Sequence, residues 1–164
     1  MTDPWRDLYD REYPRLVRAL LAMSGDGAAA EDAAQEAFVR AHRFGLKRIE
    51  RPAAWLLAVA SRDLFRRRHR RRVEDDLWQA RERDVGREGF EAASERTDLL
   101  AALRQLPERQ RSIVVARYYY GLSYAEIAAA FAISGGTVGA TLSQAIAKLR
   151  QLHLAGRLGR GAMR

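Results

Sequence analysis

The chain has 164 residues, a length that suits one domain or two small ones and excludes a large barrel enzyme. Lysine and arginine outnumber aspartate and glutamate by 29 to 21, and the formal net charge of +8 points first to a polyanionic partner such as nucleic acid. There is no cysteine, which excludes disulfides, cysteine-based zinc sites and thiol catalysis. The first ten residues carry four charges and no apolar run, so we expect no signal peptide and a cytoplasmic location.

Helical signals run along the whole chain, and no alternating pattern typical of strands occurs. Asp3 suits the N-cap of a first helix with an apolar stripe. A second helix follows residues 24–27 and runs to about Phe44, with a buried face made mostly of alanine. A third begins at Pro52, since proline is tolerated in the first helical turn, where its missing N–H has no partner anyway. We therefore predict an all-α fold.

Charge divides the chain into three parts. Residues 1–72 carry a net charge of +6, residues 73–98 a net charge of −5, and residues 99–164 a net charge of +7. The acidic part has few large apolar side chains, as linkers do. We predict two small helical domains, 1–72 and 99–164, joined by a flexible acidic linker at 73–98. The alternative is a solvated helix with its own charge pairs, and a helix start at Ser94 leaves the end of the linker open by several residues.

A basic tract follows the apolar start of the third helix. From Arg62 to Arg72 there are seven arginines and one histidine in eleven residues. Such a density repels itself unless a polyanion neutralises it, and arginine is well shaped for phosphate. Trp55, Phe65 and the loop at 45–51 could offer apolar surface to unstacked bases. The alternative is a solvated basic tract or a nonspecific nucleic-acid tail.

The second helix displays a polar face. Asp32, Gln35, Glu36 and Arg40 lie on one side of it by helical spacing. No histidine stands at Glu-x-x-His spacing, so we expect neither a metal site nor an acid–base pair. The face is either simply solvated or docks on another protein.

The C-terminal part carries the most specific pattern. A helix from Pro107 to Tyr120 ends at Gly121, and Ser123 with Glu126 forms a capping box that starts the next helix at once. That short helix is followed within a few residues by a second cap, Ser134. Two helices so closely spaced indicate a DNA-binding helix-turn-helix, the alternative being an ordinary helical hairpin.

The uncharged stretch at 127–147 could be mistaken for a membrane span. A glycine pair interrupts its middle, and it holds few large apolar residues for a segment of about 20 positions. We therefore predict no membrane insertion.

Five motifs in order make the sequence resemble an extracytoplasmic-function (ECF) sigma factor of bacterial RNA polymerase. Any one motif would be weak, whereas five at family spacing, covering nearly the whole chain, are specific. They are the segments 8–16, 30–40, 51–60, 106–111, and 121–128 with 136–138.

The resemblance implies three sets of site residues. The face that docks on core RNA polymerase would be formed by Asp32, Gln35, Glu36 and Arg40. The promoter's minus-ten element would be melted and read by Lys47, Arg48, Trp55, Arg62, Arg66, Arg67 and Arg70. The minus-thirty-five element would be read as duplex by Ser134, Gly136, Thr137, Thr141, Gln144 and Lys148. The resemblance also implies restraint by an anti-sigma factor.

The sequence departs from the family pattern at two places. Ser61-Arg62-Asp63 stands where the family more often has Arg-Asn and small apolar residues, so a base preference at the minus-ten element is not carried over. The recognition helix lacks the usual lysine and arginine, and Gly139, Thr141 and Gln144 occupy positions that are commonly basic.

We predict an alternative sigma factor that binds core RNA polymerase and directs promoter-specific transcription initiation. The alternative is a stand-alone helix-turn-helix transcriptional regulator, and a second one is an RNA-binding or nucleoid-type basic protein. We expect no enzyme activity, no cofactor, no metal and no small-molecule substrate, because no nucleophile–base pair, phosphate loop or ligand cluster occurs in the sequence.

Overall fold

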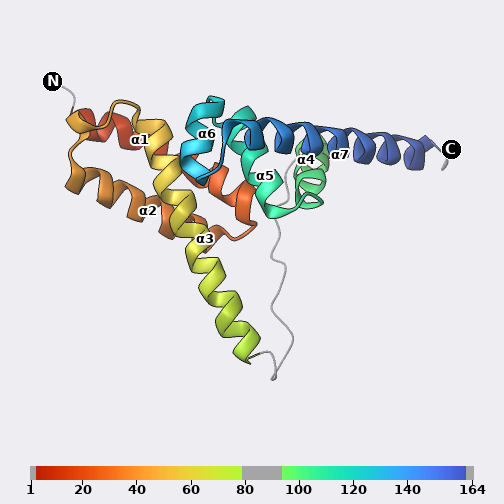
Figure 1. Ribbon diagram of the computed structural model, residues 1–164, viewed down its shortest axis with the longest axis horizontal. Coiled ribbons are helices and arrows are strands. Elements are labelled where there is room, and N and C mark those ends of the chain that lie inside the picture. Colours follow the sequence, from red (N-terminus) through yellow and green to blue (C-terminus); the bar gives the residue numbers. More distant parts are fainter. Residues whose placement is uncertain (1–2, 79–93, 162–164) are drawn as a thin grey trace.

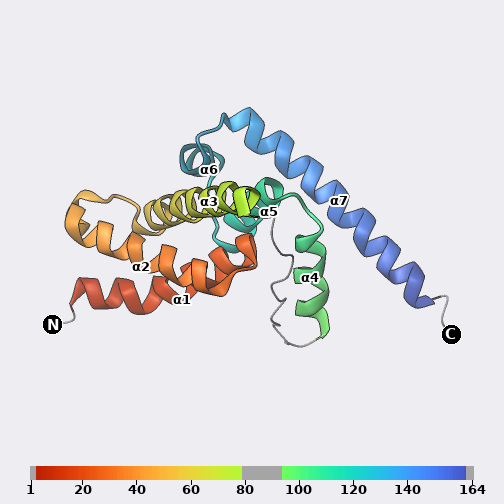
Figure 2. The same cartoon turned by 90° about the horizontal axis from the view of Figure 1, so that it is seen from below.

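The computed structural model describes residues 3–78 and 94–161, with side chains for residues 3–73 and 99–153. These residues form helices and connecting turns, and no strand occurs among them. The predicted all-α fold is confirmed for this part of the chain. Figure 1 and Figure 2 show three N-terminal helices bundled together, with the C-terminal helices against one side and α7 extending far beyond the rest. The helices are α1 (Pro4–Ser24), α2 (Gly27–Phe44), η1 (Leu46–Arg48), α3 (Pro52–Trp78), α4 (Ser94–Arg104), α5 (Glu108–Val114), η2 (Val115–Tyr119), α6 (Tyr124–Phe131) and α7 (Gly135–Gly161).

The N-terminal bundle of α1, α2 and α3 forms because its caps and its small residues fit together. Asp3 accepts a hydrogen bond from the Trp5 amide at 3.0 Å, and Asp26 accepts one from the Ala29 amide at 3.0 Å, so the first two helices both start on an aspartate cap. The inner face of α2 consists mainly of alanines with almost no exposed surface, which lets α1 and α3 approach it closely. These alanines are Ala29, Ala30, Ala33, Ala34, Ala37 and Ala41.

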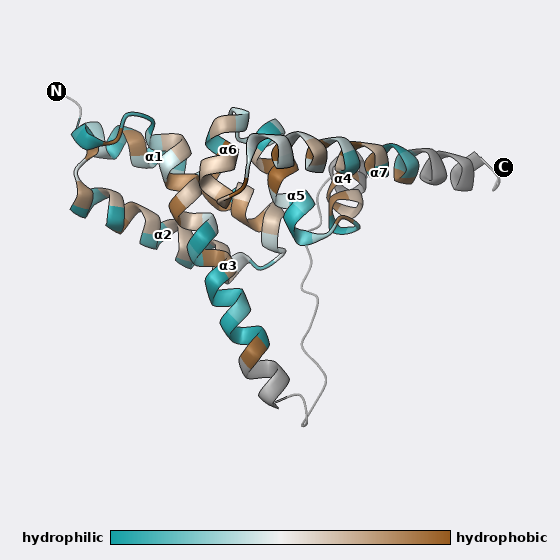
Figure 3. Ribbon diagram, in the orientation of Figure 1, coloured by the Kyte–Doolittle hydropathy of each residue, from teal (hydrophilic) through white to brown (hydrophobic). Residues whose placement is uncertain are grey.

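Helix α3 changes character along its length. Its first half is buried at Leu56, Leu57, Ala60 and Leu64. Its second half is strongly hydrophilic, as Figure 3 shows, and extends beyond the bundle. The helix continues to Trp78, so it reaches six residues into the segment predicted as linker, and α4 begins at Ser94 before that segment ends. The rest of the predicted linker, 79–93, lies outside the described residues.

The predicted helix from Pro107 to Tyr120 is present, but its second half is not α-helical. Residues 115–119 form a π-helix, in which the Tyr120 amide donates to the Val115 carbonyl at 3.0 Å. This wider turn lets Tyr120 point inward with 3% exposure, while Tyr118 and Tyr119 stay exposed. Gly121 then takes a positive φ of 77°, as expected for the residue that ends the helix.

Helices α6 and α7 form the predicted helix-turn-helix. The capping box is complete, because the Glu126 amide donates to Ser123 Oγ at 3.2 Å and the Ser123 amide donates to Glu126 Oε2 at 2.8 Å. Ala132 makes the turn in the left-handed region, with φ 53°. The axes of the two helices differ by 100°, within the range of a helix-turn-helix and far from an antiparallel hairpin.

The N-terminal bundle and the C-terminal helices share one hydrophobic core. Arg15 of α1 donates to the Tyr120 carbonyl at 2.9 Å, and its Cζ lies 4.5 Å from the centre of the Tyr120 ring. Arg111 of α5 donates to the Met23 carbonyl at 2.8 Å. Burial, and to a lesser extent the neighbouring carboxylate of Glu12, raise the pKa of Tyr120 well above its usual value. The two halves are therefore joined by buried and polar contacts, not only by the connecting chain.

Within the described residues, no single helix is long and apolar enough to cross a bilayer. Among these residues, only α6 taken together with α7 up to His153 has the length and apolar composition of a span, and the two helices are bent by 100° relative to each other. Ile127, Val138 and Leu142 of this pair are buried in the protein core.

Candidate polymerase and nucleic-acid interfaces

The four residues predicted to bind polymerase lie together on α2, opposite its alanine face. Asp32 and Gln35 are exposed, and Glu36 and Arg40 are half-buried. Arg40 Nε donates to Glu36 Oε1 at 2.7 Å, one helical turn away. The structure thus presents a compact, mainly acidic surface on a rigid helix.

The residues predicted to read the minus-ten element lie along the loop before α3 and along α3 itself. Lys47 and Arg48 are exposed in η1. Trp55 is half-buried and stacks on Phe44, with ring centroids 5.9 Å apart. Phe44 is 48% exposed, so the pair offers an open aromatic edge beside the basic loop. Phe44 was missed by the sequence reasoning, since as the last residue of α2 it resembles an ordinary apolar helix end.

The arginines of α3 have different environments. Arg66 and Arg67 contact the buried carboxylate of Asp63 at 2.9 and 2.6 Å, and Arg70 is exposed. Arg62 instead points at α6, where its guanidinium donates to the carbonyls of Ala129 and Ala130 at 2.6 and 3.2 Å.

The C-terminal end of α6 explains the placement of Arg62. The last carbonyls of a helix have no partner within it and carry partial negative charge, so a guanidinium stabilises them. The other end of α6 is also held from the N-terminal bundle, because Arg51 Nη1 lies 2.9 Å from Glu126 Oε1. Phe65 of α3 and Phe131, the last residue of α6, also contact each other, with ring centroids 6.3 Å apart. The guanidinium of Arg62 is therefore hydrogen-bonded to the C-terminal half of the chain.

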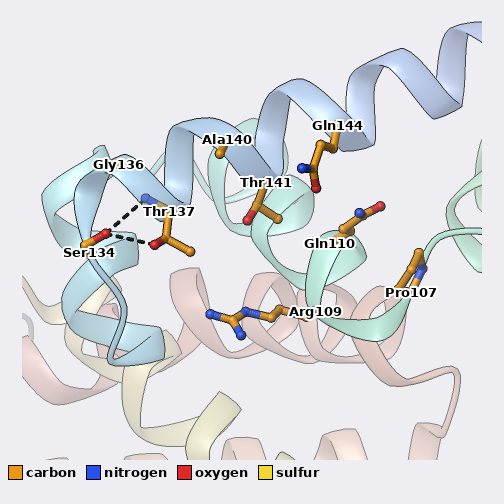
Figure 4. Close-up of a pocket in the computed structure, with 9 residues that line it drawn as sticks. All are labelled: Pro107, Arg109, Gln110, Ser134, Gly136, Thr137, Ala140, Thr141 and Gln144. Atoms are coloured by element: carbon orange, nitrogen blue, oxygen red, sulfur yellow. Dashed lines mark hydrogen bonds between the residues drawn. The ribbon is translucent and has the colours of Figure 1, made fainter.

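A groove between α5 and α7 collects most of the residues predicted for the minus-thirty-five element. Its volume is about 660 Å³. Ser134 caps α7, accepting from the Thr137 amide at 3.1 Å and sharing a hydrogen bond with the Thr137 hydroxyl at 2.8 Å (Figure 4). Lys148 is exposed further along α7 and does not line the groove. Five of the six predicted residues do line it: Ser134, Gly136, Thr137, Thr141 and Gln144.

The opposite wall of this groove was missed by the sequence reasoning. It is formed by Pro107, Arg109 and Gln110 at the start of α5 (Figure 4). Arg109 is exposed, and Gln110 Oε1 is buried with no hydrogen-bond partner within the described residues. Nothing in the local sequence shows that the first turn of α5 faces α7, because only the packing of the domain brings them together. Arg109 supplies the groove with a cation, because the α7 residues that line it are uncharged.

Two arginines of the C-terminal half, Arg111 and Arg117, make contacts within the protein. Arg111 is bonded to the Met23 carbonyl, and burial lowers the pKa of its guanidinium. Arg117 donates to the Leu122 carbonyl at 2.8 Å and lies over the Tyr124 ring. In the described part of the chain, no group of three or more histidine, aspartate and glutamate side chains is arranged to hold a metal ion.

Comparison with known proteins settles the family. Residues 8–73 match the family model of sigma-70 region 2, and residues 96–149 match that of sigma-70 region 4. The ECF RNA polymerase sigma factor SigL of Mycobacterium tuberculosis is 34% identical over 152 residues, covering 88% of this chain and 86% of SigL. The chain belongs to the ECF sigma factors. EcfG of Rhodopseudomonas palustris is 32% identical over 161 residues (93% and 86% coverage), and CarQ of Myxococcus xanthus is 34% identical over 161 residues (92% and 89% coverage).

Solved structures show the same fold. The sigma factor RpoE of Bartonella quintana, in complex with the anti-sigma factor NepR, matches with a TM-score of 0.77 at 19% identity, covering 92% of this chain and 97% of RpoE. CnrH in complex with the cytosolic domain of CnrY matches with a TM-score of 0.61 at 24% identity, covering 92% and 88%. The predicted fold class, with a sigma region 2 domain and a sigma region 4 helix-turn-helix domain, is confirmed.

Membership in this family also decides among the predicted functions. An ECF sigma factor is an alternative sigma factor that directs transcription by RNA polymerase at particular promoters, and this is the function of the chain. The stand-alone helix-turn-helix regulator is not favoured. Sigma factors are transcription regulators rather than enzymes.

Proposed function

We propose that this ECF sigma factor docks on core RNA polymerase through the exposed face of α2. The observation that carries the proposal is the division of α2 into two faces, one buried and made mainly of alanine, the other bearing the exposed Asp32 and Gln35 and the half-buried Glu36. Asp32 lies 3.8 Å from Arg67 and Glu36 lies 2.7 Å from Arg40, and both acids remain partly exposed. A basic surface of the polymerase would complement them.

The minus-ten element would be bound by the loop at 45–51 and by α3. A base removed from the stack could lie on the exposed edge of the Phe44–Trp55 pair, since base–aromatic stacking tolerates any base. The exposed cations Lys47 and Arg48 would hold the neighbouring phosphates, and Arg66, Arg67 and Arg70 those further along the strand. Phe44 joins the predicted set because it forms half of the aromatic pair.

The minus-thirty-five element would be bound along the groove between α5 and α7. Thr141 and Gln144 supply hydroxyl, methyl and amide groups, which suit adenine and thymine better than guanine. Arg109 would add a phosphate contact from the opposite wall. Because α7 brings no cation to the groove, we expect binding at this element to be weak and the N-terminal domain to dominate the choice of promoter.

The two domains would separate when both promoter elements are bound. The elements lie about 25 base pairs apart, roughly 85 Å at 3.4 Å per base pair, whereas α3 packs directly on α6 in this structure. Separation would break the contacts of Arg51 and Arg62 with α6 and would free Arg62 for phosphate. An anti-sigma factor would hold the protein inactive in the cytoplasm, a proposal supported by the complex of the similar fold RpoE with the anti-sigma factor NepR.

Reconstitution with bacterial core RNA polymerase and a promoter library tests the proposal. We expect transcripts that depend on the added protein and that share a minus-ten sequence. The matched control is the Asp32→Lys/Glu36→Lys variant, which keeps both DNA-binding domains and should give no such transcripts. Sequence-specific binding to duplex DNA without polymerase, together with no binding to core enzyme, would contradict the proposal in favour of a stand-alone regulator.

A further inference from the structure

One carboxylate on α3 lies at the centre of a cluster of arginines. Asp63 is 3% exposed, so its side chain is removed from water. Arg66 Nη2 lies 2.9 Å from its Oδ1, Arg67 Nε lies 2.6 Å from its Oδ2, and Arg40 Nη2, from α2, lies 3.6 Å from Oδ1. Three guanidinium groups from two helices therefore share a single buried acid.

The cluster continues to the acidic surface of α2. Arg67 Nη1 lies 3.8 Å from Asp32 Oδ2, and Arg40 Nε lies 2.7 Å from Glu36 Oε1. The order Asp32, Arg67, Asp63, Arg40, Glu36 thus forms a row of alternating charges across the α2–α3 interface. Asp63 is the buried member of this row and the one that holds both neighbouring arginines.

Arg66 and Arg67 each contact Asp63 and also expose part of the side chain to solvent. The side chains of Arg66 and Arg67 remain 55% and 40% exposed although each contacts Asp63. A guanidinium has five N–H donors, and a contact with one carboxylate oxygen leaves several of them free. Fixing a long side chain before it binds removes part of the conformational entropy that is otherwise lost on binding.

We propose that Asp63 is a positioning residue that fixes Arg66 and Arg67 for the phosphates of the melted promoter strand. This inference rests on the proposed function of α3 as the minus-ten helix. Asp63 itself does not touch DNA, because its carboxylate is buried and would repel phosphate. Its contribution is the placement of two cations that would otherwise move freely on the surface of a basic helix.

Two physical effects of opposite sign make the proposal testable. Neutralising Asp63 makes the cluster more positive by one unit, so a purely electrostatic account predicts tighter binding of a polyanion. Loss of positioning predicts weaker binding, because the two arginines then have to be ordered by the DNA. Whether neutralising Asp63 strengthens or weakens DNA binding therefore distinguishes a purely electrostatic effect from positioning.

The experiment uses the full chain bound to core RNA polymerase and a fluorescent single-stranded oligonucleotide carrying the minus-ten element selected from the library. We expect Asp63→Asn to weaken oligonucleotide binding about tenfold. The slope of log affinity against log salt should fall by about 0.7 for each phosphate that the variant no longer neutralises. Binding of the variant to core enzyme should stay within about twofold of wild type. Unchanged or tighter binding of the oligonucleotide would overturn the proposal.

A double-mutant cycle separates positioning from a general role in folding. If Asp63 acts through Arg66 and Arg67, then Asp63→Asn should change binding by less than about twofold in an Arg66→Ala/Arg67→Ala background. The same tenfold loss in both backgrounds would show that Asp63 only supports the packing of α2 on α3. Asp10→Asn is the matched control, because Asp10 is an exposed acid on α1 that pairs with Arg6 at 3.9 Å. It should leave the affinity within about twofold.

A second variant covers the case in which Asp63→Asn does not fold. Asp63→Glu keeps the negative charge and moves it by one methylene, so a charge effect alone leaves the affinity at the wild-type value. Positioning predicts a loss of several-fold, and a wild-type affinity would overturn it. The wild-type chain tests the proposed function separately. A wild type that binds neither core enzyme nor oligonucleotide contradicts the proposed function. If the wild type binds both and the Asp63 variants bind the oligonucleotide equally well, only the role of Asp63 is contradicted.

Discussion

Replacing Asp32 and Glu36 by lysine reverses two charges on the exposed face of α2. In the free protein this change breaks the Glu36–Arg40 pair at 2.7 Å and the longer Asp32–Arg67 contact at 3.8 Å. Both acids are partly exposed, and pairs of this kind contribute about 0.2 to 1 kcal/mol each. The free energy of unfolding should therefore fall by less than about 2 kcal/mol, and the variant should fold.

The effect on docking should be larger than the effect on folding. Disrupting close charge pairs in an interface costs about 2 to 5 kcal/mol. Since about 1.4 kcal/mol corresponds to a tenfold change in Kd, affinity for core RNA polymerase should fall by about 30-fold to several thousand-fold. A loss of binding free energy to core enzyme that exceeds the loss of folding free energy indicates a docking face, whereas a solvated face should show no loss of binding.

Fluorescence anisotropy with labelled protein and core enzyme measures the change in docking affinity, and thermal unfolding measures the change in stability. Asp7→Lys/Asp10→Lys is the matched control, because it makes the same charge change on exposed positions of α1. We expect the control to bind core enzyme within about threefold of wild type. If the α2 variant is folded and binds core enzyme as tightly as the control does, the assignment of the docking face is wrong.

Four further predictions concern DNA binding and stability. Phe44→Ala should weaken binding of the single-stranded minus-ten oligonucleotide by about 1 to 3 kcal/mol, measured by anisotropy with the holoenzyme, because it removes half of the aromatic pair; an unchanged Kd would place the base elsewhere. Arg109→Ala should weaken binding to all upstream sequences alike and lower the slope of log affinity against log salt on duplex DNA by about 0.9. Thr141→Ala/Gln144→Ala should instead reduce discrimination among upstream sequences in a promoter-variant transcription series. Strong discrimination that survives this double substitution would mean that other residues read the element. The stability of the wild type should fall as the pH rises above about 10, because the unfolded chain ionises its tyrosines there while the raised pKa of Tyr120 keeps that residue protonated in the folded state. Urea unfolding at pH values from about 8 to about 11 should show a smaller fall for Tyr120→Phe, and identical pH profiles would refute the argument.

The sequence alone determined the helices and the family, because these depend on neighbours in the chain. Caps, capping boxes and terminal prolines act over three or four residues, so Asp3, Ser123 and Ser134 mark helix starts that the structure reproduces. The two faces of α2 follow in the same way from the period of the helix. The π-helix at 115–119 was not predicted, since the extra residue in that turn is accommodated by the burial of Tyr120 against α1 and not by a local signal.

Only the tertiary structure decided how the basic side chains are used. By sequence, Arg62, Arg66, Arg67 and Arg70 form one uniform tract. In the folded chain, Arg62 stabilises the end of α6, Arg66 and Arg67 contact Asp63, and Arg70 is exposed. A guanidinium pairs with whichever acceptor the packing brings within about 3 Å, and that acceptor can lie anywhere in the chain. The carbonyls that hold Arg62 are 67 and 68 residues away, a distance over which helical periodicity carries no information.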